Sequence, residues 1–462
     1  MFIKNTVSFF LFCLMILSLE GRLVSAQDTH YWNNQYGPRA MLLSGAVIGS
    51  VSDMSGTFYN PGALGYIEKP ELLLSANVYQ ASSLTIKDGA GEDFDLSTSD
   101  FNLLPNMFAG AFRWSWLGKN KLAYSFLTRY RFNATIKGSQ TSRFDVLPEY
   151  PGEEDFAGAV SFGEDVKELW AGLTWARGVS QKVGFGITQY LSIRAQDSDA
   201  EQFAQALSDS GDIALVYDID NYSAQVYSLL WKVGLGFDFR PLTMGVTLTT
   251  PNVQLYGSGD AVVNSTRVGL DLNEDGIPDN TFTTDIQEGV PAHYKSPLSV
   301  GAGAAFDFES TKIHASVEWF DAIDSYNVLQ LESFVSQGTG QYVTRTLLHQ
   351  VASVVNFAVG LEQKVGDKST AYLSFNTDTS AYDPESDIAV TGFDIRHLAA
   401  GANFAFKDSQ FMLGFSYAWG SEKIQQVIDL NPDDDEEVID PQDEVDLVYS
   451  RFTFMLGVSV KL

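Results

Sequence analysis

The stretch FMLGFSYAWG, residues 411–420, decides the fold class. Large apolar side chains at its odd positions alternate with mostly smaller ones at its even positions, which is the period-two pattern of a β-strand. Residues 451–462 repeat the pattern, with large apolar residues at every even position. A soluble sandwich also alternates, but its second face is rarely so rich in Gly and Ala, whereas a membrane barrel turns large residues to lipid and small or polar ones to its lumen. The pattern therefore favours an outer-membrane β-barrel.

Segments of this kind recur along the chain, and we predict fourteen strands. Their expected ranges are 71–86, 103–117, 121–137, 166–178, 182–196, 219–239, 242–256, 294–308, 311–322, 349–363, 369–378, 394–406, 410–423 and 447–462. The connections between them alternate strictly between short and long. The long ones are 87–102, 138–165, 197–218, 257–293, 323–348, 379–393 and 424–446. Short turns on one side and long loops on the other are typical of an antiparallel transmembrane barrel with both termini at the periplasmic side.

The composition excludes several other classes. The 462 residues include 29 Lys and Arg against 58 Asp and Glu, a net charge of −29. Such an acidic chain does not neutralise phosphates, so we expect no nucleic-acid partner. Cys13 is the only cysteine, which excludes a disulfide scaffold. Most of the acids fall in the long connections, with an extreme at 433–437, and we interpret them as a solvated outer face that can attract divalent cations near lipopolysaccharide.

We interpret the first residues as a targeting signal and not as part of the folded protein. Lys4 precedes an apolar run from Val7 to Leu19, and Val24-Ser25-Ala26 supplies small residues for cleavage. This is the layout of a secretory signal peptide, too short to span a membrane. We predict a signal peptide over 1–26, and no later stretch is long and apolar enough for a membrane-spanning helix.

The segment before the first predicted strand carries the most specific motif, SDMSGTFYNPGALG at 52–65. Asn60-Pro61 predicts a turn, because a residue before proline avoids the α region and Asn can satisfy its own backbone. Gly62 and Gly65 permit close packing. A compact, Gly-rich segment at the periplasmic end is suited to fold into a barrel lumen as a plug.

This motif resembles the N-terminal hatch signature of the FadL/TodX outer-membrane transporters, which carry long-chain fatty acids and other hydrophobic compounds through a fourteen-stranded barrel. The family's usual Asn-Pro-Ala is Asn-Pro-Gly here, with Ala63 one place later. The resemblance implies a hatch over 27–70, a barrel over 71–462, and passive diffusion when a bound ligand shifts the hatch; some family members are thought to release it sideways. The hatch residues it implies are Phe58, Tyr59, Asn60, Pro61, Gly62 and Leu64.

A carboxylate substrate would need cations facing the lumen. The candidates from the strand pattern are Arg113, Arg129, Arg131 and Arg194. Arg can hold a carboxylate through two parallel hydrogen bonds. Alternatively, these bases pair with inward acids such as Glu168, Glu318 and Glu362 to hold the wall in shape. The acidic outer loops would repel an anion, which leaves a neutral hydrophobic ligand open.

Two further motifs bear on possible chemistry. His314 and Ser316 share a strand face and resemble the His-x-Ser arrangement of outer-membrane phospholipase, but the rest of that signature is absent, and we expect no enzyme. The stretch 271–279 offers calcium ligands at Asp271, Asn273, Asp275 and Asp279 and looks like a thrombospondin type 3 repeat. An EF-hand would need Glu at Phe282, and a plain acidic turn remains the alternative. Apart from this possible calcium ion, no cofactor is expected.

We therefore predict a monomeric barrel in the outer membrane of a Gram-negative bacterium, in contact with lipid and lipopolysaccharide, that takes up hydrophobic small molecules such as a fatty acid. The alternative is a structural or adhesive surface barrel whose acidic loops bind a partner and whose plug never opens. A general porin is disfavoured by the hatch.

Overall fold

The computed structural model describes residues 29–67, 71–89, 94–144, 152–271, 277–383, 392–425 and 444–461. The predicted signal peptide, the acidic run 433–437 and part of the candidate calcium loop lie outside these residues. No helix in the described ranges has the length and apolar character needed to cross a bilayer.

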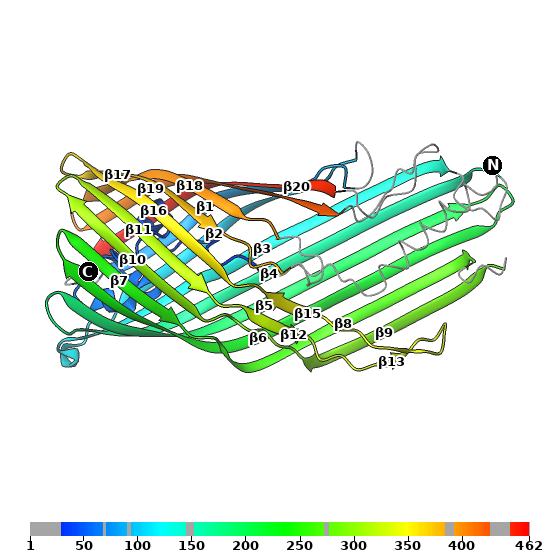
Figure 1. The fold of residues 1–462 in the computed structure, drawn as a ribbon, viewed down its shortest axis with the longest axis horizontal. Helices are drawn as coiled ribbons and strands as arrows, with labels where there is room; N and C mark the ends of the chain where they lie inside the picture. The colour runs from blue at the N-terminus through cyan, green and yellow to red at the C-terminus, as the bar shows by residue number, and fades with distance from the viewer. Residues whose placement is uncertain are drawn as a thin grey trace.

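Fourteen antiparallel strands close into a barrel, as predicted (Figure 1). They are β1 (Glu71–Ile86), β2 (Leu96–Ala111), β3 (Asn120–Phe144), β4 (Glu154–Gly178), β5 (Val183–Leu207), β6 (Ile213–Phe239), β7 (Leu242–Thr249), β10 (Ser299–Phe308), β11 (Thr311–Phe320), β16 (Val354–Val365), β17 (Ser369–Asp378), β18 (Ile395–Phe406), β19 (Ser409–Gln425) and β20 (Glu444–Lys461). The ring closes where β1 pairs with β20 along their whole length. Short turns and the C-terminus share one end of the barrel, which we call the inner end.

The outward face carries the large apolar side chains, as the alternation predicted. In β19, Leu413, Phe415 and Tyr417 are about half exposed, whereas Met412 and Gly414 between them are buried. The same exposure pattern holds on β11, β16 and β20. A continuous apolar band on the outside of a closed barrel is the surface that faces lipid, so the chain spans a membrane with its strands.

The long connections were predicted as loops, and for three of them this is wrong. Residues 138–165, 197–218 and 257–293 are mostly strand, because β3, β4, β5 and β6 continue far beyond the barrel and are joined there by β8 (Val253–Leu270) and β9 (Asp279–Pro291). Figure 1 shows these six strands running past the ends of the others. A strand of 27 residues such as β6 is roughly 90 Å long, whereas about 9–11 residues cross a bilayer. We call the six projecting strand ends the extension.

Strand β6 changes partner where the extension begins. Its inner part pairs with β7 and its outer part with β8, so β8 prolongs β7 after the break at 250–252. The break at 292–298 likewise separates β9 from β10. Asn252 joins the two breaks: its Nδ2 donates to the Tyr294 carbonyl (2.8 Å), and its Oδ1 accepts from the Ser296 amide (2.8 Å).

A long loop lies against the free edge of β9 and is joined to it by hydrogen bonds. This loop contains the short strands β12 (Ile323–Asn327), β13 (Phe334–Val335), β14 (Tyr342–Val343) and β15 (Leu348–Val351). Gln337 donates to the Thr284 carbonyl (3.0 Å) and accepts from the Thr284 amide (2.9 Å). Gln287 exchanges the same two bonds with the backbone of Glu332, each 2.8 Å long. Gln337 therefore occupies backbone groups of β9 that a neighbouring strand would otherwise use, while Gln287 of β9 holds the loop beside this edge.

The N-terminal segment, residues 29–67, contains the helices α2 (Pro38–Leu42) and α3 (Gly56–Tyr59) and the 3₁₀ helix η1 (Pro61–Gly65). Most of its apolar side chains are buried, among them Tyr36, Leu42 and Leu43 with no exposed area. They form one core with lumen-facing residues of the wall such as Leu73 and Met107. We call this segment the plug.

Candidate functional site

Wall glycines give the plug room inside the barrel. A Cβ on Gly184 would lie 2.1 Å from the Gly62 carbonyl oxygen, and a Cβ on Gly186 would lie 2.3 Å from that of Pro61. Such distances are far below van der Waals contact, so only glycine lets the two backbones meet here. A Cβ on Gly245 would likewise lie too close to the carbonyl oxygen of Ile48.

The Asn60-Pro61-Gly62 motif fixes the plug to this wall. Asn60 Nδ2 donates to the carbonyls of Ile48 (3.0 Å) and Leu235 (2.9 Å), while its Oδ1 caps η1 by accepting from the Gly62 amide (3.0 Å). A Cβ on Gly62 would lie 2.5 Å from the Gly234 carbonyl oxygen. The glycine that departs from the family's usual alanine is therefore required by the close wall.

The other residues of the hatch motif lie in the same core. Phe58 packs at right angles to Tyr59, with 5.1 Å between ring centroids, and Leu64 is buried. The Tyr59 hydroxyl donates to Gln35 Oε1 (2.7 Å) and accepts from the Tyr36 amide (3.0 Å).

His314 and Ser316 bind the plug, which gives both residues a structural role. The His314 Nδ1 hydrogen-bonds the Ser50 hydroxyl (2.8 Å), and the Ser316 hydroxyl accepts from the Ile48 amide (3.2 Å). Arg39 of the plug forms an ion pair with Glu362 of the wall at 2.6 Å. Glu362 was expected to face inward, but its pairing with Arg39 could not be predicted, because the two residues are more than three hundred positions apart.

A small chamber lies between the plug and the wall at the level where β7 and β10 break. Five aromatic residues line it, namely Tyr31, Phe58, Trp170, Tyr294 and Phe320. Lys232 and Glu318 of its lining lie 3.6 Å apart, and Glu168, also in the lining, lies 3.6 Å from Arg194. The free volume is about 40 Å³, enough for water but not for an extended lipid. The chamber in this conformation therefore does not admit an extended lipid.

The four predicted head-group arginines separate into two pairs. Arg194 lines the lumen beside Glu168, and Arg129 lies over the Trp170 ring, 5.5 Å from its centroid. Arg131 faces outward and pairs with Asp165, so its predicted lumenal position is wrong. The cause is a bulge between Thr128 and Tyr130, which inverts the alternation beyond it.

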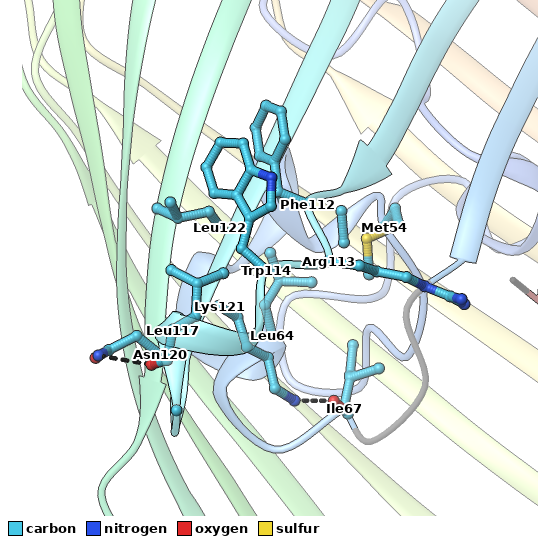
Figure 2. A pocket seen from close by; sticks show the side chains of 13 residues that line it. Met54, Leu64, Ile67, Phe112, Arg113, Trp114, Leu117, Asn120, Lys121 and Leu122 are labelled. Carbon is cyan, nitrogen blue, oxygen red and sulfur yellow. Dashed lines mark hydrogen bonds between the residues drawn. The ribbon is translucent and has the colours of Figure 1, made fainter.

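Arg113 follows the end of β2 and belongs to a cavity at the inner end of the barrel. This cavity, about 390 Å³, lies between the plug and the β2–β3 turn, which contains the 3₁₀ helix η2 (Ser115–Leu117). Figure 2 shows Lys121 donating to the Ile67 carbonyl, while Arg113 and Trp114 point in different directions. Arg113 is exposed here, so it does not face the closed chamber.

On the outer side of the plug, the lumen is apolar. Its buried lining comes from β1, β2, β3, β4, β18, β19, β20 and the residues just before β18, and comprises Leu84, Leu96, Ile136, Val160, Phe393, Ile395, Ala418, Leu447 and Tyr449. The first plug residues reach this cluster, since His30 Nε2 hydrogen-bonds the Phe393 carbonyl (2.8 Å). We call it the outer cluster.

The wall beside the plug is incompletely paired. Strands β2 and β3 pair only over Met107–Ala111 and Ala123–Leu127 among the described residues. Beyond this point Pro105 has no amide hydrogen to donate, and its carbonyl accepts instead from the Thr128 hydroxyl (2.8 Å). Phe101 and Leu103 next to the break are each about two-thirds exposed on the outward face. A break in the hydrogen-bonded wall therefore faces the lipid band.

The lumenal face of the extension carries polar pairs next to an apolar cluster that the long loop covers with Leu329 and Leu347. Arg267 holds Asp218 through two bonds of 2.7 and 2.9 Å, and Arg345 of the long loop pairs with Asp220. Glu164 is buried beside Gln196, whose Nε2 donates to it (2.8 Å). Burial raises the pKa of Glu164 to about 8, which leaves the carboxyl largely protonated at neutral pH.

The candidate calcium residues are only partly described. Asp271 and Asp279 flank the turn between β8 and β9, while Asn273 and Asp275 lie outside the described residues. Within the described ranges, no three His, Cys, Asp or Glu side chains gather as they would around a metal ion.

The structure is similar to solved barrels of hydrophobic-compound transporters. The Pseudomonas putida toluene transporter TodX aligns with a TM-score of 0.57 at 13% identity, over 94% of this chain and all of that one. The Ralstonia pickettii toluene transporter TbuX aligns at 0.54 and 13% (93% and 98% of the chains), and a Pseudomonas aeruginosa FadL homologue at 0.56 and 12% (96% and 99%). No family model matches the sequence, and no curated protein matches it.

The fold and its lipid-facing band define a fourteen-stranded outer-membrane β-barrel. Its fold is that of the FadL/TodX transporters, as the hatch motif suggested.

Proposed function

We propose that this chain is a monomeric, non-catalytic channel for the passive uptake of hydrophobic small molecules across the outer membrane, gated by the plug. The observation that carries the proposal is the outer cluster, an apolar lining above an apolar plug. A hydrophobic molecule would not bind in an open, water-filled channel. An apolar lining lowers the free energy of such a molecule inside the lumen.

The route follows from the order of these features along the barrel. A ligand enters between the strands of the extension, binds in the outer cluster, and meets the chamber closed by Phe58 and Trp170. Because the chamber is too small for the ligand, the plug has to shift before passage. The ligand then leaves through the break between β2 and β3 into the lipid beside Phe101 and Leu103.

The substrate class is a long-chain amphiphile or another hydrophobic compound. The structural neighbours named above are a toluene transporter from each of two bacteria and a FadL homologue, and their shared fold makes this class the first to test.

The gating step can be tested by tying the plug to the wall. The hydroxyl oxygens of Ser44 in the plug and Ser374 in β17 lie 2.8 Å apart, so cysteines at both positions are placed to form a disulfide. Cys13 of the predicted signal peptide is the only natural cysteine. We expect liposomes containing the oxidised Ser44→Cys/Ser374→Cys variant to lose uptake of a labelled fatty acid, and reduction to restore it.

A disulfide away from the plug is the matched control. Ser333 and Thr344 of the long loop have hydroxyl oxygens 2.6 Å apart, both exposed, and cysteines there should leave uptake unchanged in either redox state. Equal uptake by the oxidised and reduced plug variant would refute gating.

The extension favours one alternative, a surface barrel that binds a partner and does not transport. If neither the unmodified protein nor the double-cysteine variant in either redox state takes up the fatty acid, the result would support that alternative.

A further inference from the structure

The sheet of the extension has two edges, and only one of them is protected. At the β9 edge, the long loop is held by the hydrogen bonds of Gln287 and Gln337. The other edge is β3, which pairs with β4 as far as Phe144 but with β2 only up to Leu127. Beyond Leu127, no strand in the described part of the chain pairs with β3 on the β2 side. We call this side of residues 131–143 the open edge.

The open edge continues past the neighbouring strand. From the pair Met107–Leu127, β2 reaches only to Leu96, whereas β3 runs on to Phe144. The outermost part of β3 therefore projects beyond β2, and another strand can approach it from the side.

The direction of the unused backbone groups follows from the pairing on either side of the bulge at Thr128. The Phe112 amide donates to the Leu122 carbonyl (2.9 Å), so even-numbered residues of β3 point their backbone groups to β2 there. The bulge shifts this pattern by one residue. Beyond it, the odd-numbered residues of 131–143 point amide and carbonyl groups to the open edge, and none of them is proline.

The same odd-numbered residues turn their side chains outward. Three of them are cations, namely Arg131, Lys137 and Arg143. On the β4 side, Arg131 pairs with Asp165 and Arg143 with Asp155, while Lys137 lies opposite the uncharged Ser161. A strand added at the open edge would therefore meet a row of positive charge.

These features select the chemistry of the occupant. A peptide strand fits the open edge because its backbone supplies both donors and acceptors, whereas a lipid phosphate only accepts. A second copy of this chain is disfavoured, because its cations would lie against the same row of cations. An acidic strand replaces this repulsion by attraction.

The lumenal side of β3 defines the other half of the pattern. Ala134 and Ile136 are buried there, and Ile136 belongs to the outer cluster. Because successive side chains of a strand point to opposite faces, every second side chain of an added strand would lie on the side of Ile136, where an apolar residue fits. The added strand should therefore alternate acidic and apolar residues.

We propose that the open edge of β3 binds an extended segment of a partner protein, in which acidic and apolar residues alternate, as an additional strand of the extension. Main-chain hydrogen bonds supply the affinity, and the cations together with Ile136 select the sequence. This assignment does not depend on the proposed uptake function, because it uses an edge of the extension and no residue of the plug.

The test uses a fluorescent peptide of four Glu-Val repeats and the full-length protein in phosphatidylcholine nanodiscs. Fluorescence anisotropy should show saturable binding. We expect Lys137→Glu to weaken it about tenfold, because a favourable cross-strand charge pair becomes an unfavourable one. Arg240→Glu makes the same charge change at an exposed turn of the inner end, and this control should bind the peptide as the unmodified protein does.

Two further changes separate strand addition from charge attraction alone. Ser139→Pro removes an amide that points to the open edge and leaves the bonds to β4 in place, so binding should weaken by roughly threefold or more. In the peptide, N-methylation of the alternate amides that face β3 should abolish binding, and N-methylation of the other alternate amides should be tolerated. If both methylated peptides bind as tightly as the parent peptide, strand addition is refuted.

Other outcomes would also overturn the proposal. They are the absence of saturable peptide binding, or undiminished binding by Lys137→Glu, and neither affects hydrophobic uptake. Light scattering of the protein without peptide tests the other occupant. A dimer that Ser139→Pro converts to a monomer would assign the open edge to a second copy of this chain instead of an acidic partner.

Discussion

Strand β4 runs through two environments, and its outward side chains change where one gives way to the other. In the barrel, Leu169, Leu173 and Trp175 face lipid; in the extension, Asp165 and Lys167 take the corresponding positions. The backbone pairing with β3 and β5 continues through the change. Hydrogen bonding thus builds both regions in the same way, while the solvent outside selects the side chains.

The largest expected effect comes from placing the same charge on the outward face of each region. Leu173→Arg puts a cation into the lipid band and should cost about 2–4 kcal/mol of stability. Ser161→Arg, on the same face of the same strand in the extension, should change stability by no more than about 0.5 kcal/mol. Reversible denaturant unfolding in lipid vesicles measures both. Similar losses for the two variants would mean that the extension is also embedded in lipid.

A glycine pair compares the plug contact on the lumenal side of the wall with an outward-facing position in the extension. Gly184→Ala forces a Cβ against the plug backbone and should destabilise the packed plug by about 1–3 kcal/mol. Gly163→Ala in the extension meets nothing closer than 3.7 Å and should be neutral or stabilise by about 0.4–1 kcal/mol. Hydrogen exchange of residues 38–65 reports on the plug, and unchanged protection in Gly184→Ala would show that the plug does not depend on this contact.

The pH dependence of the extension concerns a single buried carboxyl group. Because burial raises the pKa of Glu164 from 4.5 to about 8, the folded extension retains a proton that the unfolded chain releases. Its stability should therefore fall as pH rises from 4.5 to 8 and level off above that. Hydrogen exchange of β4 and β5, corrected for intrinsic rates, should show this slope in the unmodified protein. Glu164→Gln should flatten it, and an equal slope in the variant would place the titrating group elsewhere.

The sequence predicted the part of the fold that lipid determines. Strand β1 occupies the predicted range 71–86, and the outward rows of β19 and β20 are as expected, because a lipid-facing strand has to be apolar on one side. The extension was not predicted, because its outward face meets water instead of lipid. That face is therefore polar, and a strand such as 197–207 looks like a loop.

The site was less predictable, because it depends on register and on distant pairs. The bulge at Thr128 moved Arg131 to the outside, and a two-residue period alone does not reveal such a shift. The Asn60-Pro61-Gly62 turn was predictable because its conformation is local.

The protected edge of β9 has a consequence for the packing of neighbouring molecules in the membrane. Gln337 of the long loop occupies the backbone groups of Thr284, which the edge strand of another copy could otherwise use, and Gln287 of β9 fixes Glu332 of the loop beside this edge. Neighbouring molecules can therefore pack closely in the membrane without pairing their sheets edge to edge along β9.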